Sequence, residues 1–319
     1  MNKLSRIYIA GHRGLVGSAL LRKLISDGHT NIVARSRSEL DLEDFNATKV
    51  FFEAERPEYV ILSAAKVGGI YANNIYPVDF LMSNLLVQAN VFRAAYEVGV
   101  KRLLFLGSSC IYPRDCEQPI KEDYLLTGLL EPTNRPYALA KITGIEMCWS
   151  YNRQYGTKWL AAMPTNTYGP GDNYDLISSH VMAALIRKIH EAKINNKDEV
   201  VLWGTGSPKR EFLYVDDLAK ALVKLIFIDQ VSYDNLINLS APPIINIGSG
   251  NDLTINELAK LVAKVIGFRG HFVNDKTKPD GIMRKVLDVS KIKSYGWYPE
   301  VDLDAGISLT YKSYLDCLN

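Results

Sequence analysis

A glycine-rich segment near the N-terminus constrains the fold of this chain more than any other feature. The apolar run Ile7–Ala10 is followed by Gly11-His-Arg-Gly14-Leu-Val-Gly17 and then by an amphipathic pattern to about Asp27. Glycines in a strand-to-helix turn let the backbone approach a pyrophosphate, whose charge the helix N-terminus stabilises. The segment therefore predicts a dinucleotide-binding unit, and a tight turn without a ligand is the alternative interpretation.

Strand-like and helix-like segments alternate through the first half of the chain. Residues 66–74 are too polar and glycine-rich for a helix, so we expect a loop there. The alternation is typical of an α/β protein with a Rossmann-type, doubly wound parallel sheet. Strands are expected near 59–65, 102–107 and 159–163, and helices near 46–55, 78–98 and 137–154.

The pattern becomes less regular beyond residue 171. Residues 245–250 resemble a strand that returns to the main sheet. We expect residues 1–171 to form the cofactor domain, with returning segments near 211–250. Residues 172–319 would form mainly a smaller, interleaved substrate domain.

The composition limits the kinds of partner that this chain can have. Its 319 residues carry a net charge of +2, which argues against a nucleic-acid or membrane-binding surface. No apolar run reaches membrane-spanning length, and the N-terminus enters a strand pattern without the shape of a signal peptide. The four cysteines show neither metal-ligand nor disulfide spacing, so we expect no bound metal and a cytoplasmic protein.

Arginines after the second expected strand indicate which dinucleotide binds. An NAD site usually has an acidic residue there for the ribose 2′-hydroxyl. This chain has Arg35 and Arg37 instead, and Arg13 lies within the glycine loop. Because arginine pairs well with a 2′-phosphate, we expect NADPH rather than NADH. Arg35 is expected to be a solvated surface charge, and Asp41 and Leu42 to lie beside the adenine.

A tyrosine and a lysine, Tyr137 and Lys141, lie one helical turn apart, with Ser108 upstream. A nearby ammonium stabilises tyrosinate, so we expect the tyrosine pKa to fall from about 10 towards neutrality. Such a phenol can donate a proton to a carbonyl oxygen as hydride reaches the carbon, and Ser108 would hold the same oxygen. The Tyr-x-x-x-Lys spacing alone also arises by chance on helices.

These motifs together resemble those of an extended short-chain dehydrogenase/reductase that acts on a nucleotide sugar. Longer blocks, which are more specific than the glycine loop, resemble the GDP-L-fucose synthase family over nearly the whole chain. The blocks are Gly11–Gly14, Ala65–Gly69, Ala72–Asn74, Gly107–Pro113, Glu131–Asn134, Ser150–Gly156, Met163–Asn166 and Lys278–Gly281.

The resemblance implies an enzyme with both epimerase and reductase activity. Its substrate would be GDP-4-keto-6-deoxy-D-mannose, which is inverted at C3 and C5 and then reduced at C4 by NADPH to GDP-L-fucose. Protons on C3 and C5 are acidic because both carbons flank the C4 ketone. Cys110 and His180 match the family's acid/base pair, and a thiol and an imidazole both titrate near neutral pH. Without the resemblance, Cys110 would be interpreted as a small buried residue and His180 as a surface residue.

The resemblance also assigns binding residues. Arg210 and Lys188 would face the GDP phosphates or the guanine, although Trp203 by its chemistry alone is more often a core residue. Substrate contacts are expected at Asn166, Lys188, Trp203, Arg210 and Asp280. Cofactor contacts are expected at Gly11, Arg13, Gly14, Leu15, Val16, Gly17, Arg37, Asp41, Leu42, Lys141, Pro164, Asn166 and His180.

Several alternatives remain open at this point. A GDP-colitose synthase, which inverts only C5, or a GDP-deoxy-heptose reductase would share almost every motif. Retention of both Cys110 and His180 favours epimerisation but does not say how many centres are inverted. A nucleotide-sugar dehydratase would carry a Thr-Asp-Glu type acid pair where this chain has Ser108-Ser109-Cys110. A non-catalytic NADP-binding regulator would generally lack the tyrosine or the lysine.

The oligomeric state is implied only by the resemblance. The family pairs two subunits through the helices near 78–98 and 137–154 in a four-helix bundle. A homodimer is therefore expected, and the alternative is that these helices are simply part of the core.

Overall fold

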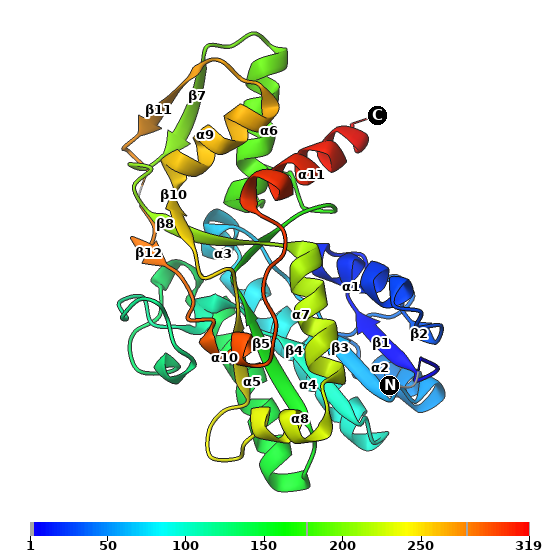
Figure 1. Cartoon of the computed structure of the whole chain (residues 1–319). Coiled ribbons are helices and arrows are strands. Elements are labelled where there is room, and N and C mark those ends of the chain that lie inside the picture. The colour runs from blue at the N-terminus through cyan, green and yellow to red at the C-terminus, as the bar shows by residue number, and fades with distance from the viewer. Residues whose placement is uncertain (1–2, 177, 279, 319) are drawn as a thin grey trace.

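Within the described residues, which are 3–176, 178–278 and 280–318, a six-stranded parallel sheet forms the centre of the molecule (Figure 1). The strand order is β2-β1-β3-β4-β5-β9. Three of these strands are buried along their whole length, because helices cover both faces of the sheet. The bounds are β1 Ile7–Ala10, β2 Ile32–Val33, β3 Tyr59–Leu62, β4 Arg102–Leu106, β5 Trp159–Pro164 and β9 Ile244–Ile247.

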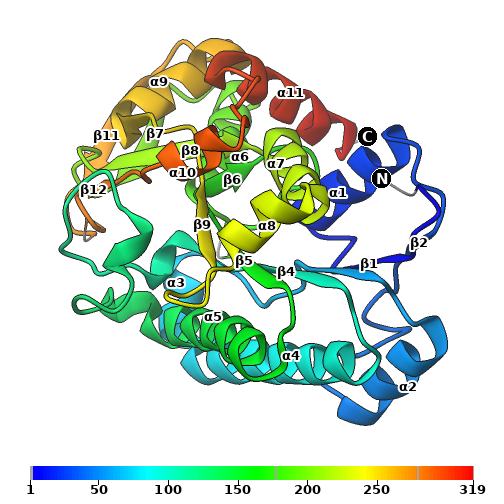
Figure 2. The ribbon, with the colours of Figure 1, turned by 60° about the horizontal axis from the view of Figure 1, so that its bottom comes forward.

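Helices pack on both faces of this sheet, as Figure 2 shows. On one face lie α1 (Leu15–Ser26), α7 (Val215–Phe227) and α8 (Gln230–Leu236). On the other lie α2 (Phe45–Glu55), α4 (Pro77–Glu97) and α5 (Arg135–Tyr155). The predicted doubly wound α/β fold is confirmed, including the return of residues 244–247 beside β5. The strand order reverses between β1 and β3, and such sheets bind ligands outside the carboxyl ends of their strands at that point.

A second, smaller apolar core lies beyond the end of β5 (Figure 1). Its sheet is built on β8, which pairs with β6, β10 and β12, and β7 pairs separately with β11. The strands are β6 Asn166–Tyr168, β7 Glu199–Trp203, β8 Lys209–Tyr214, β10 Asp252–Thr254, β11 His271–Asp275 and β12 Arg284–Lys285. The helices are α6 Val181–Ile194, α9 Ile255–Ile266 and α11 Leu303–Asp316, and α10 (Ser290–Ser294) packs near β9.

The segment expected to be a loop at 66–74 contains a short helix, α3 (Ile70–Ile75), so that prediction is wrong. The Asn73 side chain donates to the carbonyls of Gly68 and Gly69 at 2.8 and 3.1 Å. The Gly69 N–H donates to the Ser178 carbonyl at 3.0 Å. This last bond joins residues far apart in the chain, so local composition gives no sign of it.

Short 3₁₀ turns shape the proline-containing segment between β4 and α5. They are η1 (Ser109–Ile111), η2 (Glu122–Tyr124) and η3 (Pro132–Asn134). Among the described residues, no helix is both long enough and apolar enough to span a membrane. Pro279, within the Lys278–Gly281 block, lies outside the described residues.

Arg102 connects the start of β4 to the end of α7. This residue is only 8% exposed, and its guanidinium donates to the carbonyls of Ile226 and Ile228 at 3.0 and 2.7 Å. The guanidinium also lies 4.0 Å from the centroid of the Tyr233 ring. A cation at the carbonyls of a helix C-terminus is favourable because it opposes the partial negative charge there. Arg102 therefore holds the helix layer onto the sheet.

We predict that Arg102→Met keeps the buried stem but leaves two buried carbonyls without their partner. The free energy of unfolding, measured by urea titration, should fall by about 2–4 kcal/mol. Arg114→Met is the matched control, because Arg114 is 49% exposed and pairs only with the neighbouring Asp115. That control should change the same quantity by less than about 0.5 kcal/mol. Equal losses in the two variants would contradict this role of Arg102.

Candidate active site

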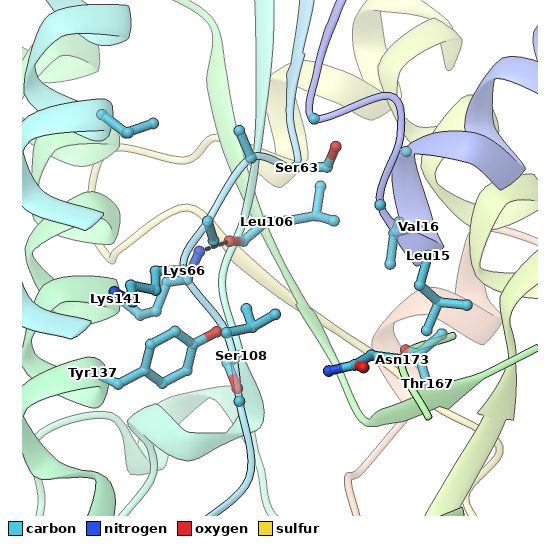
Figure 3. A pocket seen from close by; sticks show the side chains of 18 of the residues that line it. Leu15, Val16, Ser63, Lys66, Leu106, Ser108, Tyr137, Lys141, Thr167 and Asn173 are labelled. Atoms are coloured by element: carbon cyan, nitrogen blue, oxygen red, sulfur yellow. Dashed lines mark hydrogen bonds between the residues drawn. The ribbon is translucent and has the colours of Figure 1, made fainter. Parts of the chain in front are cut away.

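A cavity of about 660 Å³ lies at the carboxyl ends of β1, β3, β4 and β5 (Figure 3). The glycine loop and α1 contribute one side of it, and α5 with the turn after β4 contributes another. Residues 164–180, which lead from β5 towards α6, contribute much of the rest. The cavity therefore occupies the position where doubly wound sheets bind nucleotides.

The glycine loop leaves no room for side chains. Gly11 has φ +87°, and a Cβ there would lie 2.7 Å from the Ala64 nitrogen. A Cβ on Gly17 would lie 2.0 Å from the Gly11 carbonyl oxygen. Gly11, Gly14, Leu15, Val16 and Gly17 all line the cavity, at the N-terminus of α1. This cradle fits a pyrophosphate, whose charge the helix N-terminus would stabilise.

The three arginines expected near a 2′-phosphate behave differently. Arg37 is exposed, lines the cavity and pairs with Glu43 at 2.8 Å. Arg35 also lines the cavity, but it is half-buried and pairs with Glu55 at 2.8 Å. The prediction that Arg35 is a solvated surface charge is therefore wrong, because the fold places an acidic partner beside it. Arg13 does not line the cavity, whereas Asp41 and Leu42 do, as expected.

Lys141 is 2% exposed and holds α5 against the end of β4. Its Nζ donates to the Leu106 carbonyl at 2.7 Å and lies 4.7 Å from the centroid of the Phe105 ring. Burial lowers the pKa of this ammonium from its usual value to about 7. One carbonyl and one aromatic face replace only part of the water that a free ammonium would have.

Tyr137 points toward Ser108 across the cavity wall, as Figure 3 shows. Burial raises the pKa of the phenol well above its usual value, the Cys110 charge raises it further, and a hydrogen bond with Ser108 opposes the shift. The expectation of a lowered tyrosine pKa is therefore wrong for this structure. The physical reason is that Lys141 directs its ammonium to a carbonyl, and its Nζ lies 5.8 Å from the Tyr137 ring centroid.

Cys110 lies in η1, half-buried, in the wall of the same cavity. Asn134 Nδ2 lies 3.2 Å and Lys285 Nζ 3.6 Å from the Cys110 sulfur. Both groups are donors, and Lys285 also carries a positive charge, so both suit a sulfur that loses its proton. Asn134 belongs to a block quoted for the family, whereas Lys285 on β12 had no signal in the sequence.

His180 is the N-cap residue of α6 and lines the cavity with Ser178 and Ser179. The surrounding protein lowers the pKa of the imidazole below its usual value through desolvation, although solvent reaches the ring from the cavity. Near neutral pH the ring is therefore mostly neutral and able to accept a proton. The structure thus brings Cys110 and His180 to one cavity from segments about seventy positions apart.

Two of the remaining expected contacts, Pro164 and Asn166, line the cavity at the end of β5 and the start of β6. Asn166 Nδ2 donates to the Glu211 carbonyl at 2.8 Å. Glu211 itself is fully buried, and its carboxylate accepts from the N–H groups of Gly250 and Leu287 at 2.6 and 2.9 Å. These bonds hold β8 and the segment after β12 beside the cavity.

The expected substrate residues of the smaller part form a separate group outside the cavity wall. Lys188 Nζ lies 5.2 Å above the Trp203 ring, which is 56% exposed and therefore not a core residue. Asp280 accepts from the backbone N–H and the hydroxyl of Thr205 at 2.9 and 2.7 Å. An exposed aromatic face between cations and a carboxylate suits a purine base with attached phosphates.

Arg210 connects this separate group to the cavity electrostatically. Burial lowers the pKa of its guanidinium, and the charges of Cys110, Glu131 and Asp280 oppose that shift. Arg210 also donates to the Ile282 carbonyl, which fixes the guanidinium at the start of β8. A buried cation in this position suits a diphosphate that links a base at Trp203 to a sugar at Cys110.

Sequence reasoning missed several polar groups in the cavity wall. Among the described residues, Asn73 Oδ1, Asn134 Oδ1, Asp172 Oδ2 and Ser179 Oγ are buried, line the cavity and have no hydrogen-bond partner. Burial raises the pKa of Asp172 to about 7. Asn73 and Asn134 lie in blocks quoted for the family, but no role had been attached to them.

Comparison with known proteins gives full-length relatives. Residues 7–247 match the model of the NAD dependent epimerase/dehydratase family. A putative GDP-L-fucose synthase of Arabidopsis thaliana is 55% identical over 99% of this chain and 93% of its own. The GDP-L-fucose synthase of Escherichia coli is 50% identical over 98% of this chain and 97% of its own. A GDP-L-colitose synthase of Yersinia pseudotuberculosis is 39% identical over 98% of both chains.

Solved structures agree with this assignment. A GDP-mannoheptose C4 reductase from Campylobacter jejuni with NADP bound has a TM-score of 0.87 and 38% identity over 99% of both chains. An NADP-bound GDP-L-fucose synthetase from Naegleria fowleri has a TM-score of 0.89 and 28% identity, over 100% of this chain and 95% of that one. The chain therefore belongs to the NAD dependent epimerase/dehydratase family and, within it, to the GDP-L-fucose synthases.

Proposed function

We propose that this chain converts GDP-4-keto-6-deoxy-D-mannose to GDP-L-fucose, by inverting C3 and C5 and then reducing C4 with NADPH. The observation that carries this proposal is that one cavity holds two chemically different sets of residues. Ser108 and Tyr137 suit ketone reduction, and Cys110 and His180 suit proton exchange at the neighbouring carbons. A reductase or an epimerase alone would need only one of these sets.

Tyr137 supplies the proton for the reduction. When bound, NADPH would supply the hydride that adds to C4. The Ser108 hydroxyl and the Tyr137 phenol would both hold the C4 oxygen. Because burial raises the pKa of Tyr137, the phenol keeps its proton near neutral pH and is in the acid form that the step requires. An alkoxide is a stronger base than a tyrosinate, so the transfer is favourable.

Cys110 and His180 exchange the protons at C3 and C5. Inversion requires one group to accept a proton while another donates one from the opposite side of the carbon. Asn134 and Lys285 stabilise the sulfur when it has lost its proton, and the neutral His180 ring can accept a proton. The keto group at C4 stabilises the carbanion that forms between the two transfers.

The cofactor is NADPH, and its binding residues are proposed from the cavity wall. The glycine loop would hold the pyrophosphate, and Arg37 would pair with the 2′-phosphate by exchanging its bond with Glu43. Asp41 and Leu42 would lie near the adenine, and Lys141, Pro164, Asn166 and His180 near the opposite end. Arg13 has no support from the cavity and stays a prediction of the resemblance alone.

The nucleotide of the substrate would lie between the smaller part and the cavity. Trp203 and Lys188 would face the guanine side, Asp280 would accept hydrogen bonds, and Arg210 would pair with the diphosphate. We therefore propose that residues 1–171, with segments returning near 211–250, bind the cofactor and that residues 172–319 mainly bind the substrate. The GDP-colitose and GDP-deoxy-heptose relatives fit the alternative substrates at lower identity.

We also propose a homodimer formed through α4 and α5, and a cytoplasmic location. Val78, Met82 and Leu86 on α4 are 67%, 46% and 39% exposed, and their spacing of four places them on one helix face. Leu139 on α5 is also exposed, at 39%. Exposed apolar patches of this kind often mark interfaces. The described cysteines are all free, which suits a reducing compartment.

The reaction in deuterated water tests the proposed function directly. Purified protein, NADPH and GDP-4-keto-6-deoxy-mannose should give GDP-fucose with deuterium at both C3 and C5, as read by NMR. Deuterium at C5 alone would favour a colitose-type enzyme. Deuterium at neither carbon would make the chain a plain reductase and remove the role proposed for Cys110 and His180.

We predict that Tyr137→Phe abolishes NADPH oxidation, because the C4 oxygen has no acid to protonate it. Deuterium exchange at C3 and C5 of the keto sugar should remain detectable by NMR. Cys110→Ser is the complementary variant, which should lose exchange by about 10²–10⁴-fold while NADPH binding stays within about twofold. Equal loss of exchange in a folded Tyr137→Phe protein would contradict the separation of roles.

We predict that Arg37→Ala lowers the preference for NADPH over NADH, measured as the ratio of kcat/KM values, by roughly 10- to 100-fold. The reason is the loss of a charge-assisted bond to the 2′-phosphate. Arg35→Ala is the matched control, because that guanidinium is already held by Glu55 and by the Ala34 carbonyl. If Arg35→Ala changed the ratio and Arg37→Ala did not, the phosphate would lie at Arg35.

A further inference from the structure

The Asn73 carbonyl oxygen is a buried acceptor whose direction is fixed by the fold. Asn73 is 4% exposed, and its Nδ2 donates to the carbonyls of Gly68 and Gly69. Because both targets are acceptors, the nitrogen must face them and Oδ1 must face elsewhere. Oδ1 has no partner among the described residues, and Asn73 lines the cavity. The oxygen is therefore available to a ligand.

Asn134 presents a second acceptor in the same wall. Its Nδ2 donates to the Cys110 sulfur at 3.2 Å, and its Oδ1 is buried without a partner. The two heteroatoms of an amide share one carbon, so this oxygen lies in the same small region as the sulfur. α3, which carries Asn73, packs against η3, which ends with Asn134. Two carbonyl oxygens thus lie in adjoining elements of the wall near Cys110.

A buried acceptor without a partner costs free energy unless a ligand supplies a donor. A sugar hydroxyl is such a donor. Of the two carbons that flank the C4 ketone, C3 carries a hydroxyl, whereas C5 carries a methyl group and the ring oxygen. Only C3 can therefore satisfy an acceptor placed beside the residue that exchanges the proton.

We propose that Asn73 and Asn134 accept hydrogen bonds from the C3 hydroxyl of the keto sugar and thereby select substrates that carry this hydroxyl. The inference rests on the proposed function and adds to it the residues that determine which sugar is used. A 3-deoxy sugar would leave both oxygens buried and unpaired. Sites built to bond a substrate hydroxyl reject analogues that lack it.

The test compares GDP-4-keto-6-deoxy-D-mannose with its 3-deoxy analogue, GDP-4-keto-3,6-dideoxy-D-mannose. NADPH oxidation gives kcat/KM for each sugar. The unmodified protein should favour the 3-hydroxylated sugar by on the order of 10- to 100-fold or more. Asn73→Ala should reduce this ratio by on the order of tenfold, because the variant loses the acceptor that only the hydroxylated sugar uses.

Asn84→Ala is the matched control. Asn84 holds the same segment in the same way, because its Nδ2 donates to the carbonyls of Lys66 and Phe80. Its Oδ1, however, accepts from the Lys66 N–H within the protein and is not left for a ligand. A variant that only loosens the segment should lower kcat/KM for both sugars equally and leave the ratio unchanged.

Asn134→Asp provides a second comparison. The aspartate keeps an acceptor but loses the N–H that donates to Cys110. It should therefore lower kcat/KM for both sugars while keeping more of the ratio than Asn134→Ala does. This comparison separates hydroxyl recognition from support of the sulfur.

The outcomes separate this inference from the proposed function. No turnover of either sugar by the folded, unmodified protein would overturn the proposed function. Turnover with a ratio that Asn73→Ala leaves unchanged would overturn the inference alone. A loss of NADP⁺ affinity in Asn73→Ala, measured by calorimetry and without a change in ratio, would also overturn it, because the acceptor would then serve the cofactor.

Discussion

The bond from the Lys141 ammonium to the Leu106 carbonyl is the interaction on which the geometry of the site depends. It places a helix from one layer directly on the last residue of a central strand. Ser108 follows that strand by two positions, and Tyr137 precedes Lys141 by one helical turn. A single buried contact therefore sets the position of the two groups that are proposed to hold the ketone oxygen. The desolvation that lowers the Lys141 pKa accompanies this arrangement.

The rest of the site depends on the joining of two cores. Cys110 comes from the turn after β4 in the main part, whereas Lys285 comes from β12 in the smaller sheet. Glu211, fully buried between them, holds β8 to the segments at Gly250 and Leu287. Movement between the two parts would therefore change the surroundings of the sulfur directly. The epimerisation site is assembled from both parts, while the reduction site belongs to one.

The comparison of sequence and structure differs between kinds of residue. The glycine loop, the Tyr137–Lys141 pair and the return of β9 were predicted from local spacing, and the structure has them where expected. The site roles themselves stay predictions. The helix at α3 was missed because a bond to Ser178 supports it from about a hundred positions away. The pKa of Tyr137 was predicted in the wrong direction, because spacing on a helix does not show where an ammonium is directed.

The sequence by itself determined the strand–helix alternation, the nucleotide-binding turn and the residue types available for chemistry. Each of these depends on backbone sterics and on periodicity within a few residues. Only the tertiary structure decided which groups surround Cys110, that Arg35 pairs with Glu55, and that Asn73 has one oxygen without a partner. These features arise from contacts between distant segments and from the loss of water on burial. Hydrogen bonding and charge at a site depend on both, and neither is encoded in local spacing.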